Sequence, residues 1–166
     1  MVMPAGYFSL VPIALIAALA IPLSVTDIRE HRLPNRYTYF LIATATAGTL
    51  LGSLLEALWV DFAAGIALGV VTALVGYLLA RFGAIGMGDV KLLTAMHVCL
   101  GWHSPVLVLF SLSLSLALAS SISLIGLVMG KLNPRTLIPL GPYLLIGFLV
   151  VSYSPVSAVI TGEASS

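Results

Sequence analysis

Residues 105–129 read PVLVLFSLSLSLALASSISLIGLVM, a run of apolar and small residues without a single charged side chain. Its centre, SLSLSLALASSIS at 111–123, alternates with a period of two, which taken alone predicts a β-strand. The whole run, however, exceeds the roughly 20 residues that a helix needs to cross a bilayer, and the other apolar runs of the chain do not alternate. We therefore interpret this stretch as a transmembrane helix and reject a transmembrane β-barrel.

The composition places the chain in a membrane. Of its 166 residues 60% are hydrophobic and 8% are charged, and the mean hydropathy is +1.15. Ordinary soluble domains have about 25% charged residues, so a soluble fold of this size could not bury so much apolar surface. The net charge of +1 gives no indication of a nucleic-acid partner. A single cysteine, Cys99, excludes an internal disulfide and a cysteine zinc cluster, and we interpret it as a packing residue.

Hydropathy predicts an all-α, polytopic protein with six transmembrane helices and short connections, forming a single membrane-embedded domain over residues 1–166. The helices are expected near Tyr7–Val25, Tyr37–Leu55, Phe62–Ala80, Val90–Gly101, Pro105–Met129 and Leu137–Tyr153. The fourth is short and could begin beneath the membrane surface. Small residues recur at helical spacing in the third, at Gly65, Gly69, Ala73 and Gly76, which predicts close packing against a neighbouring helix.

The first apolar segment is expected to stay in the mature protein. Ala18–Ala20 resembles a signal-peptidase site, but no Lys or Arg precedes the segment and Pro22 follows the site closely. A secretory signal has its positive charge in front of the apolar segment, whereas here the first positive charge follows it, at Arg29.

The basic residues predict the orientation. All seven fall in loops that six crossings place on one side of the membrane: Arg29, Arg32, Arg36, Arg81, Lys91, Lys131 and Arg135. The other side receives Glu56, Asp61 and His103. The positive-inside rule then predicts that the basic loops are cytoplasmic, that both termini are outside, and that the chain lies in the cytoplasmic (inner) membrane.

Two aspartates are expected to meet at the cytoplasmic face. Asp27 ends the first helix and Asp89 opens the fourth, and the chain crosses the membrane twice between them. Asp89 lies in GAIGMGDVKLL, residues 83–93, where Gly86 and Gly88 are expected to allow an irregular backbone and to leave room for a peptide. Asp61 is expected at the opposite face.

Paired acids of this kind favour an aspartyl protease. Two nearby carboxyl groups cannot both ionise easily, so they share a proton. The ionised group can then take a proton from a water that attacks a peptide carbonyl, while the protonated group donates to the carbonyl oxygen. The alternative is that Asp27 and Asp89 are solvated acids paired with Arg29 and Lys91.

Three stretches together resemble one family. They are DIREHRLPN at 27–35, GMGDVKLL at 86–93 and IPLGPYL at 138–144, and their order and spacing match the membrane core of the type IV prepilin peptidases, which are GxGD aspartyl proteases. The resemblance implies that Asp27 and Asp89 are the catalytic pair. It also implies prepilin or prepilin-like substrates with a basic leader, and neither a cofactor nor a metal.

The sequence departs from the long members of that family. Those have a cytoplasmic domain, often with paired Cys-x-x-Cys motifs, and also methylate the new N-terminus. Here about 26 residues precede Asp27, and there is one cysteine. The chain resembles the short, core-only peptidases of tight-adherence (Flp-type) pilus systems, and we expect cleavage without N-methyltransferase activity.

Further polar residues complete the predicted site. Glu30 is a candidate partner for a basic leader. Lys91 belongs to the family-like motif and could tune the pKa of Asp89 or bind the phosphate of a membrane lipid. Pro139, Gly141 and Pro142 are expected to break the sixth helix near its cytoplasmic end and to line the site, because such a break needs cover from protein or water.

Several assignments stay open. Pro34 and Asn35 are read as the start of the second helix, and His97 as a packed histidine rather than a proton shuttle. The rival function is a small transporter or ion-coupled carrier, which also uses acids and broken helices but usually near the midplane and with internal repeats. A purely structural membrane subunit is the third reading. The sequence makes no prediction of the oligomeric state.

Overall fold

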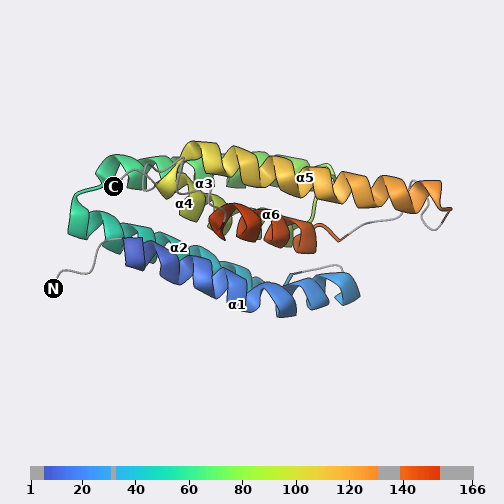
Figure 1. The fold of residues 1–166 in the computed structure, drawn as a ribbon, viewed down its shortest axis with the longest axis horizontal. Helices are drawn as coiled ribbons and strands as arrows, with labels where there is room; N and C mark the ends of the chain where they lie inside the picture. The colour runs from blue at the N-terminus through green and yellow to red at the C-terminus, as the bar shows by residue number, and fades with distance from the viewer. Residues whose placement is uncertain (1–5, 31–32, 131–138, 154–166) are drawn as a thin grey trace.

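A computed structural model describes residues 6–30, 33–130 and 139–153, with side chains from Leu10 onward. Within these residues the chain forms six helices and no strand (Figure 1). They are α1 (Gly6–Glu30), α2 (Asn35–Glu56), α3 (Trp59–Arg81), α4 (Met87–His103), α5 (Pro105–Val128) and α6 (Gly141–Tyr153). The predicted all-α class is confirmed, and the alternating stretch at 111–123 is helical.

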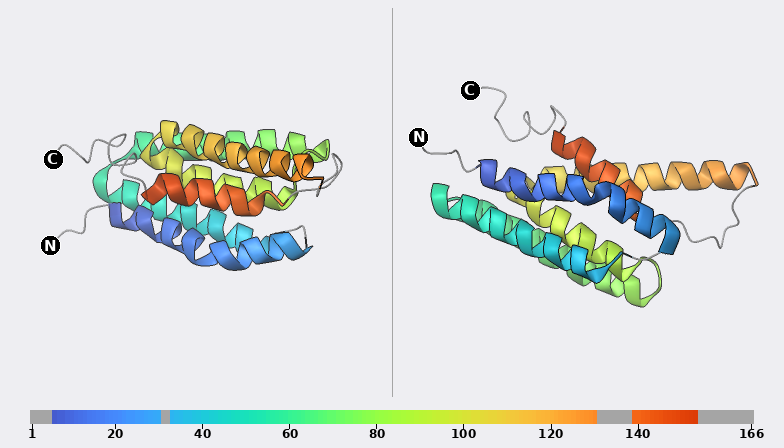
Figure 2. Two further views of the ribbon diagram at one scale, coloured as in Figure 1. Left: turned by 45° about the vertical axis from the view of Figure 1, so that its right-hand side comes forward. Right: turned by 90° about the horizontal axis from the view of Figure 1, so that it is seen from below.

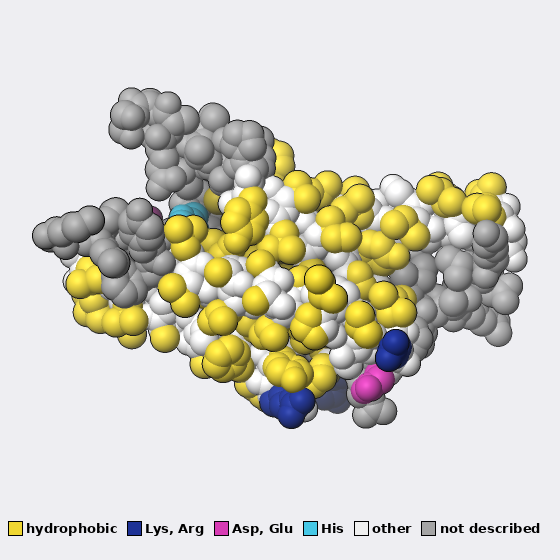
Figure 3. Space-filling model, turned by 60° about the horizontal axis from the view of Figure 1, so that its bottom comes forward, with side chains coloured by type: hydrophobic (Ala, Val, Ile, Leu, Met, Phe, Trp, Pro, Cys, Tyr) yellow, Lys and Arg dark blue, Asp and Glu magenta, His cyan; other side chains and the backbone are white. Residues whose placement is uncertain are grey.

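Four of these helices are long and apolar enough to cross a membrane: α1 from Leu10 onward, α2, α3 and α5. Large hydrophobic side chains on them face outward, including Ile21, Val60, Leu74 and Leu109. Figure 3 shows such side chains spread over one face of the bundle, with the charged side chains gathered along its lower right edge. The outer surface is thus suited to lipid, which indicates a multi-pass membrane protein. Six crossings remain a prediction, because α4 and α6 are shorter.

Helix α4 is the centre of the bundle. It packs against all five other helices. Its buried side chains run from Asp89 to Trp102 and include Leu92 and Met96, which are almost fully enclosed. A helix that is covered by protein on all sides does not need the length of a lipid-facing span. This explains why it is short, as predicted, although it begins at Met87, earlier than the expected Val90.

Glycines on α3 allow its close contact with α4. A Cβ atom added to Gly65 would come within 2.7 Å of the Val98 carbonyl oxygen, and one added to Gly76 within 2.6 Å of Val90 Cγ1. Gly69 faces the Val98 side chain in the same way. The predicted small-residue stripe is therefore a packing face, because close backbone approach substitutes for a hydrophobic driving force in lipid.

Successive helices run in alternating directions. As a result the ends of α1, α3 and α5 lie at the same end of the bundle as the starts of α2, α4 and α6 (Figures 1 and 2). We call this the motif end, because it contains Asp27 and Asp89. Four basic residues lie in helices near this end: Arg29, Arg36, Arg81 and Lys91. Glu56 and Asp61 lie at the opposite end, as the charge pattern predicts.

Candidate active site

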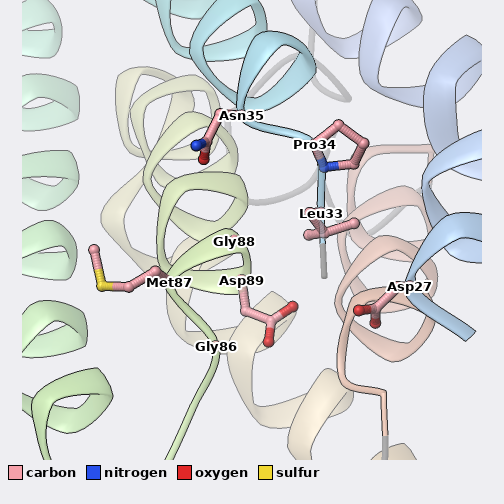
Figure 4. Close-up of a pocket in the computed structure, with 8 residues that line it drawn as sticks. All are labelled: Asp27, Leu33, Pro34, Asn35, Gly86, Met87, Gly88 and Asp89. Atoms are coloured by element: carbon pink, nitrogen blue, oxygen red, sulfur yellow. The ribbon is translucent and has the colours of Figure 1, made fainter. Parts of the chain in front are cut away.

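Asp27 and Asp89 share one pocket at the motif end, with a volume of about 290 Å³. Asp27 lies near the end of α1, and Asp89 lies in the first turn of α4. Figure 4 shows their carboxyl groups pointing toward one another across the pocket. The pocket is lined by Asp27, Leu33, Pro34, Asn35, Gly86, Met87, Gly88 and Asp89. The structure therefore brings together the two acids that the sequence selects.

The Asp89 carboxyl group is held at the start of α4. Asp89 is 8% exposed, and the backbone of Gly86 hydrogen bonds to the Asp89 carboxylate. An acid in the first turn also interacts favourably with the helix dipole. The other oxygen, Oδ1, is buried and has no hydrogen-bond partner among the described residues. Buried polar atoms are usually satisfied, so an unpaired carboxylate oxygen on a pocket-lining residue is a candidate to bind water or substrate.

The Asp27 carboxyl group is held by the start of α6. Asp27 is 3% exposed, and its Oδ2 accepts a hydrogen bond of 2.9 Å from the backbone N–H of Gly141. A Cβ atom on residue 141 would come within 2.7 Å of the same oxygen. Glycine is thus required at this position for the N–H to approach the acid.

The glycines beside Asp89 do not adopt a backbone conformation that needs glycine, so that part of the expectation is wrong, while room for a peptide stays a prediction. Gly86 has φ −75° and ψ 142°, which any residue can adopt, and Gly88 is part of α4. An added Cβ on Gly86 would lie 3.0 Å from Asp89 Oδ2. On Gly88 it would lie 2.8 Å from the Cβ and 3.0 Å from the backbone nitrogen of Leu33. Gly88 therefore lets the segment that follows α1 lie directly on the start of α4.

The expected break in helix α6 takes a different form. The helix begins at Gly141, so Gly141 and Pro142 start it, and Pro139 precedes it in non-helical backbone. Proline suits a first turn because the N–H groups there have no partner within the helix. Residues 137–138 of the expected helix lie outside the described residues. Of the three predicted residues, Gly141 contacts the site directly through Asp27.

Two further predicted residues lie beside the pocket rather than in its lining. Glu30 is exposed at the end of α1. Lys91 is half-buried, and its Nζ donates a hydrogen bond of 2.7 Å to Asn35 Oδ1.

Sequence reasoning missed four lining residues. Leu33 and Met87 were not selected, and Pro34 and Asn35 were read only as a helix start. The signal for Leu33 and Asn35 was present, since both belong to the stretch DIREHRLPN that begins with Asp27. Met87 stands between two motif glycines but points away from the two acids (Figure 4).

Comparison with known proteins now decides the family. A model of the type IV leader peptidase family matches residues 13–130. The chain belongs to this family. The matched region contains both pocket aspartates and ends before α6. Searches of curated proteins and of solved structures gave no match.

The peptidase is thus a helical membrane protein with a carboxylate pair in a common pocket. Its described residues contain no group of three or more His, Cys, Asp or Glu side chains that could hold a metal ion. His97 is buried on α4 and packs against α3, with its Nδ1 2.7 Å from Thr72 Oγ1. Cys99 is also buried.

Proposed function

We propose that this peptidase is an aspartyl endopeptidase that removes the short basic leader from prepilin or prepilin-like proteins at the cytoplasmic face of the inner membrane. The observation that carries the proposal is the meeting of Asp27 and Asp89. They belong to helices far apart in the sequence, yet both line one pocket and point toward one another. Family membership supports peptidase activity in general, and the pair supplies its chemistry.

In the proposed mechanism the two carboxyl groups share one proton, because ionising both at close range is unfavourable. The ionised group takes a proton from a water molecule, whose oxygen attacks the carbonyl carbon of the scissile peptide. The protonated group donates to the carbonyl oxygen. Collapse of the tetrahedral intermediate breaks the C–N bond, and the leaving nitrogen takes a proton, so that one water is consumed for each bond cut.

The surroundings of the pair support this chemistry. The Gly141 N–H fixes one oxygen of Asp27, and the Gly86 backbone fixes the Asp89 carboxylate. Asp89 Oδ1 is buried and lacks a hydrogen-bond partner among the described residues, as expected for a carboxyl oxygen whose partner is a water or a substrate group. Such support keeps both acids in a constant geometry during attack.

The pocket sets a limit on the substrate. Its volume of about 290 Å³ suits a short peptide segment but not a folded protein. The leader is therefore expected to enter as an extended chain. Exposed Glu30, at the end of α1, is proposed to attract its basic residues. The basic residues of the peptidase at this end set its topology and would repel the leader.

Co-expression with candidate prepilins tests the proposal. We expect one or more of them to shift to a smaller size on a gel only when the peptidase is present, and N-terminal sequencing of the product to give a single cut after a basic leader. Cleavage that is blocked by a serine or thiol reagent, or absent for every prepilin-like protein tried, would contradict it.

A further inference from the structure

A side-chain hydrogen bond joins two walls of the pocket. One wall is the start of α2, which contributes Pro34 and Asn35, and the other is the start of α4, which contributes Asp89. Lys91 Nζ of α4 donates to Asn35 Oδ1 of α2 over 2.7 Å, across 56 positions of sequence. The bond therefore links the helix turn that carries one acid to the segment that follows the other.

The direction of Lys91 agrees with a role outside the chemistry. Lys91 follows Asp89 by two positions, and helical residues two apart do not share a face. The ammonium group reaches α2, where it bonds to Asn35. There it also lies 4.4 Å from the centre of the Tyr39 ring. Asn35 and Tyr39 are one turn apart on α2, so together they hold the ammonium through a hydrogen bond and a cation–π contact.

The start of α4 contains two residues without side chains. Gly86 and Gly88 flank Met87 and have no side chains with which to anchor the turn. Gly88 instead rests on Leu33, two residues before Asn35. The Leu33 contact sets how closely α4 approaches the segment. The Lys91 bond to Asn35 is directional, so it fixes the position of α4 along the segment that contains Leu33 and Asn35.

We propose that Lys91 and Asn35 are positioning residues that set the placement of Asp89 relative to Asp27. The inference rests on the proposed function, since it concerns the geometry of the same acid pair. Lys91 acts on the acid through the position of α4 and not by contact with substrate.

The chain offers a matched control in Arg36. Its guanidinium lies 4.6 Å from the centre of the Tyr37 ring, and Nη2 donates to Tyr37 Oη over 2.9 Å. This pair has the same chemistry, a cation on a tyrosine ring with a hydrogen bond, and lies at the same end of α2. It joins neighbouring residues of one helix, however, and its described contacts do not link the pocket walls.

The test uses the full chain, purified in detergent. The substrate is an uncut prepilin that the wild-type peptidase cleaves. Lys91→Met and Asn35→Leu should each lower kcat about tenfold with KM changed less than twofold, because a misplaced group weakens the chemical step. Lys91→Arg retains a long cationic donor and should recover most of the rate. The double variant should lose no more than either single one, since both remove the same bond. Arg36→Met should cleave like wild type.

Two results would overturn the inference. The first is a wild-type kcat for Lys91→Met in an assay in which Asp89→Asn is inactive. That result would contradict the inference about Lys91 but would leave the proposed function standing. The other is equal loss in Lys91→Met and Lys91→Arg together with a lower melting temperature, which shows a merely structural role. Failure of wild type to cut any prepilin would instead remove the proposed function, and this inference with it.

Discussion

The backbone N–H of Gly141 donates a hydrogen bond to Oδ2 of Asp27, 2.9 Å away and 114 positions earlier in the chain. Helix α6, the last described helix, therefore contributes to the surroundings of an acid on α1. The same contact explains why the third motif-like stretch, IPLGPYL, belongs with the two that contain the aspartates.

Gly141→Ala should impair cleavage. The added methyl group would come within 2.7 Å of Asp27 Oδ2, so either the carboxyl group turns or the start of α6 moves away. A displacement of about 1 Å in a reacting group costs on the order of 10²-fold in rate. We expect a fall of this order in kcat, measured per folded molecule.

Gly147→Ala is the control for this change. Gly147 lies further along α6 and packs on Ser115, and its Cβ would come within 2.8 Å of the Ser111 carbonyl oxygen. We expect a lower melting temperature with normal cleavage by the molecules that remain folded. Equal activity loss in the two variants would show that Gly141 acts through packing alone.

Asp27→Asn and Asp89→Asn should each abolish cleavage, because the two acids hold different protonation states during attack and neither can replace the other. Expression and membrane insertion should be unchanged, since loss of a charge eases burial. Asp27→Glu and Asp89→Glu should lose about 10²-fold, because an extra methylene moves the carboxyl group by about 1 Å. A gel-shift assay with purified variants measures all four.

Asp61→Asn is the matched acid at the other end of the bundle, in the first turn of α3. It should cleave like wild type. Near-normal cleavage by Asp89→Asn would end the aspartyl mechanism.

The orientation can be read with reporter fusions. Fusions after Arg36, Arg81 and Arg135 should report a cytoplasmic location, and fusions after Leu58 and His103 an external one, because all seven basic residues segregate to one set of loops. An external signal after Arg81 would place the start of α4, and hence Asp89, on the wrong side for a cytoplasmic leader.

Trp102→Phe should lower stability without changing the chemistry. Trp102 Nε1 of α4 donates to Ser53 Oγ of α2 over 2.7 Å, and both groups are buried far from the pocket. Hydrogen bonds between membrane helices contribute about 0.6 kcal/mol on average. We expect a loss of this size in unfolding measurements, with normal kcat.

Ser53→Ala and the double variant complete that cycle. Because both single changes remove the same bond, the double variant should lose less than the sum of the two. Strict additivity would show that the bond makes no separate contribution.

The sequence predicts the helices well because lipid imposes a simple rule. Each long apolar run must satisfy its own backbone, so α2, α3 and α5 follow directly from hydropathy. The early start of α4 was not predicted, because glycines at 86 and 88 suggest a loop. Only the packing of Gly88 on Leu33 shows why a glycine is needed inside a helical turn there.

The acids and Gly141 were predicted as site residues, whereas the hydrogen bonds around the acids were not. Asp27 and Asp89 stand out because acids beside apolar helices are costly. The Gly141 N–H is a backbone group, which no side-chain pattern reveals. Asn35 follows a proline at the start of a helix, and this position alone is enough to explain why an asparagine stands there. Its bond to Lys91 can therefore be seen only in the packing of α2 on α4.

The central place of α4 also bears on how the peptidase is made. Helix α4 packs against all five other described helices, so it can complete these contacts only after all of them have been synthesised. Asp27 likewise receives its Gly141 donor only when α6 is in place. The proposed catalytic pair therefore reaches its described surroundings only after α6 has been synthesised, and we expect a nascent chain halted before α6 to carry both acids without the Gly141 hydrogen bond.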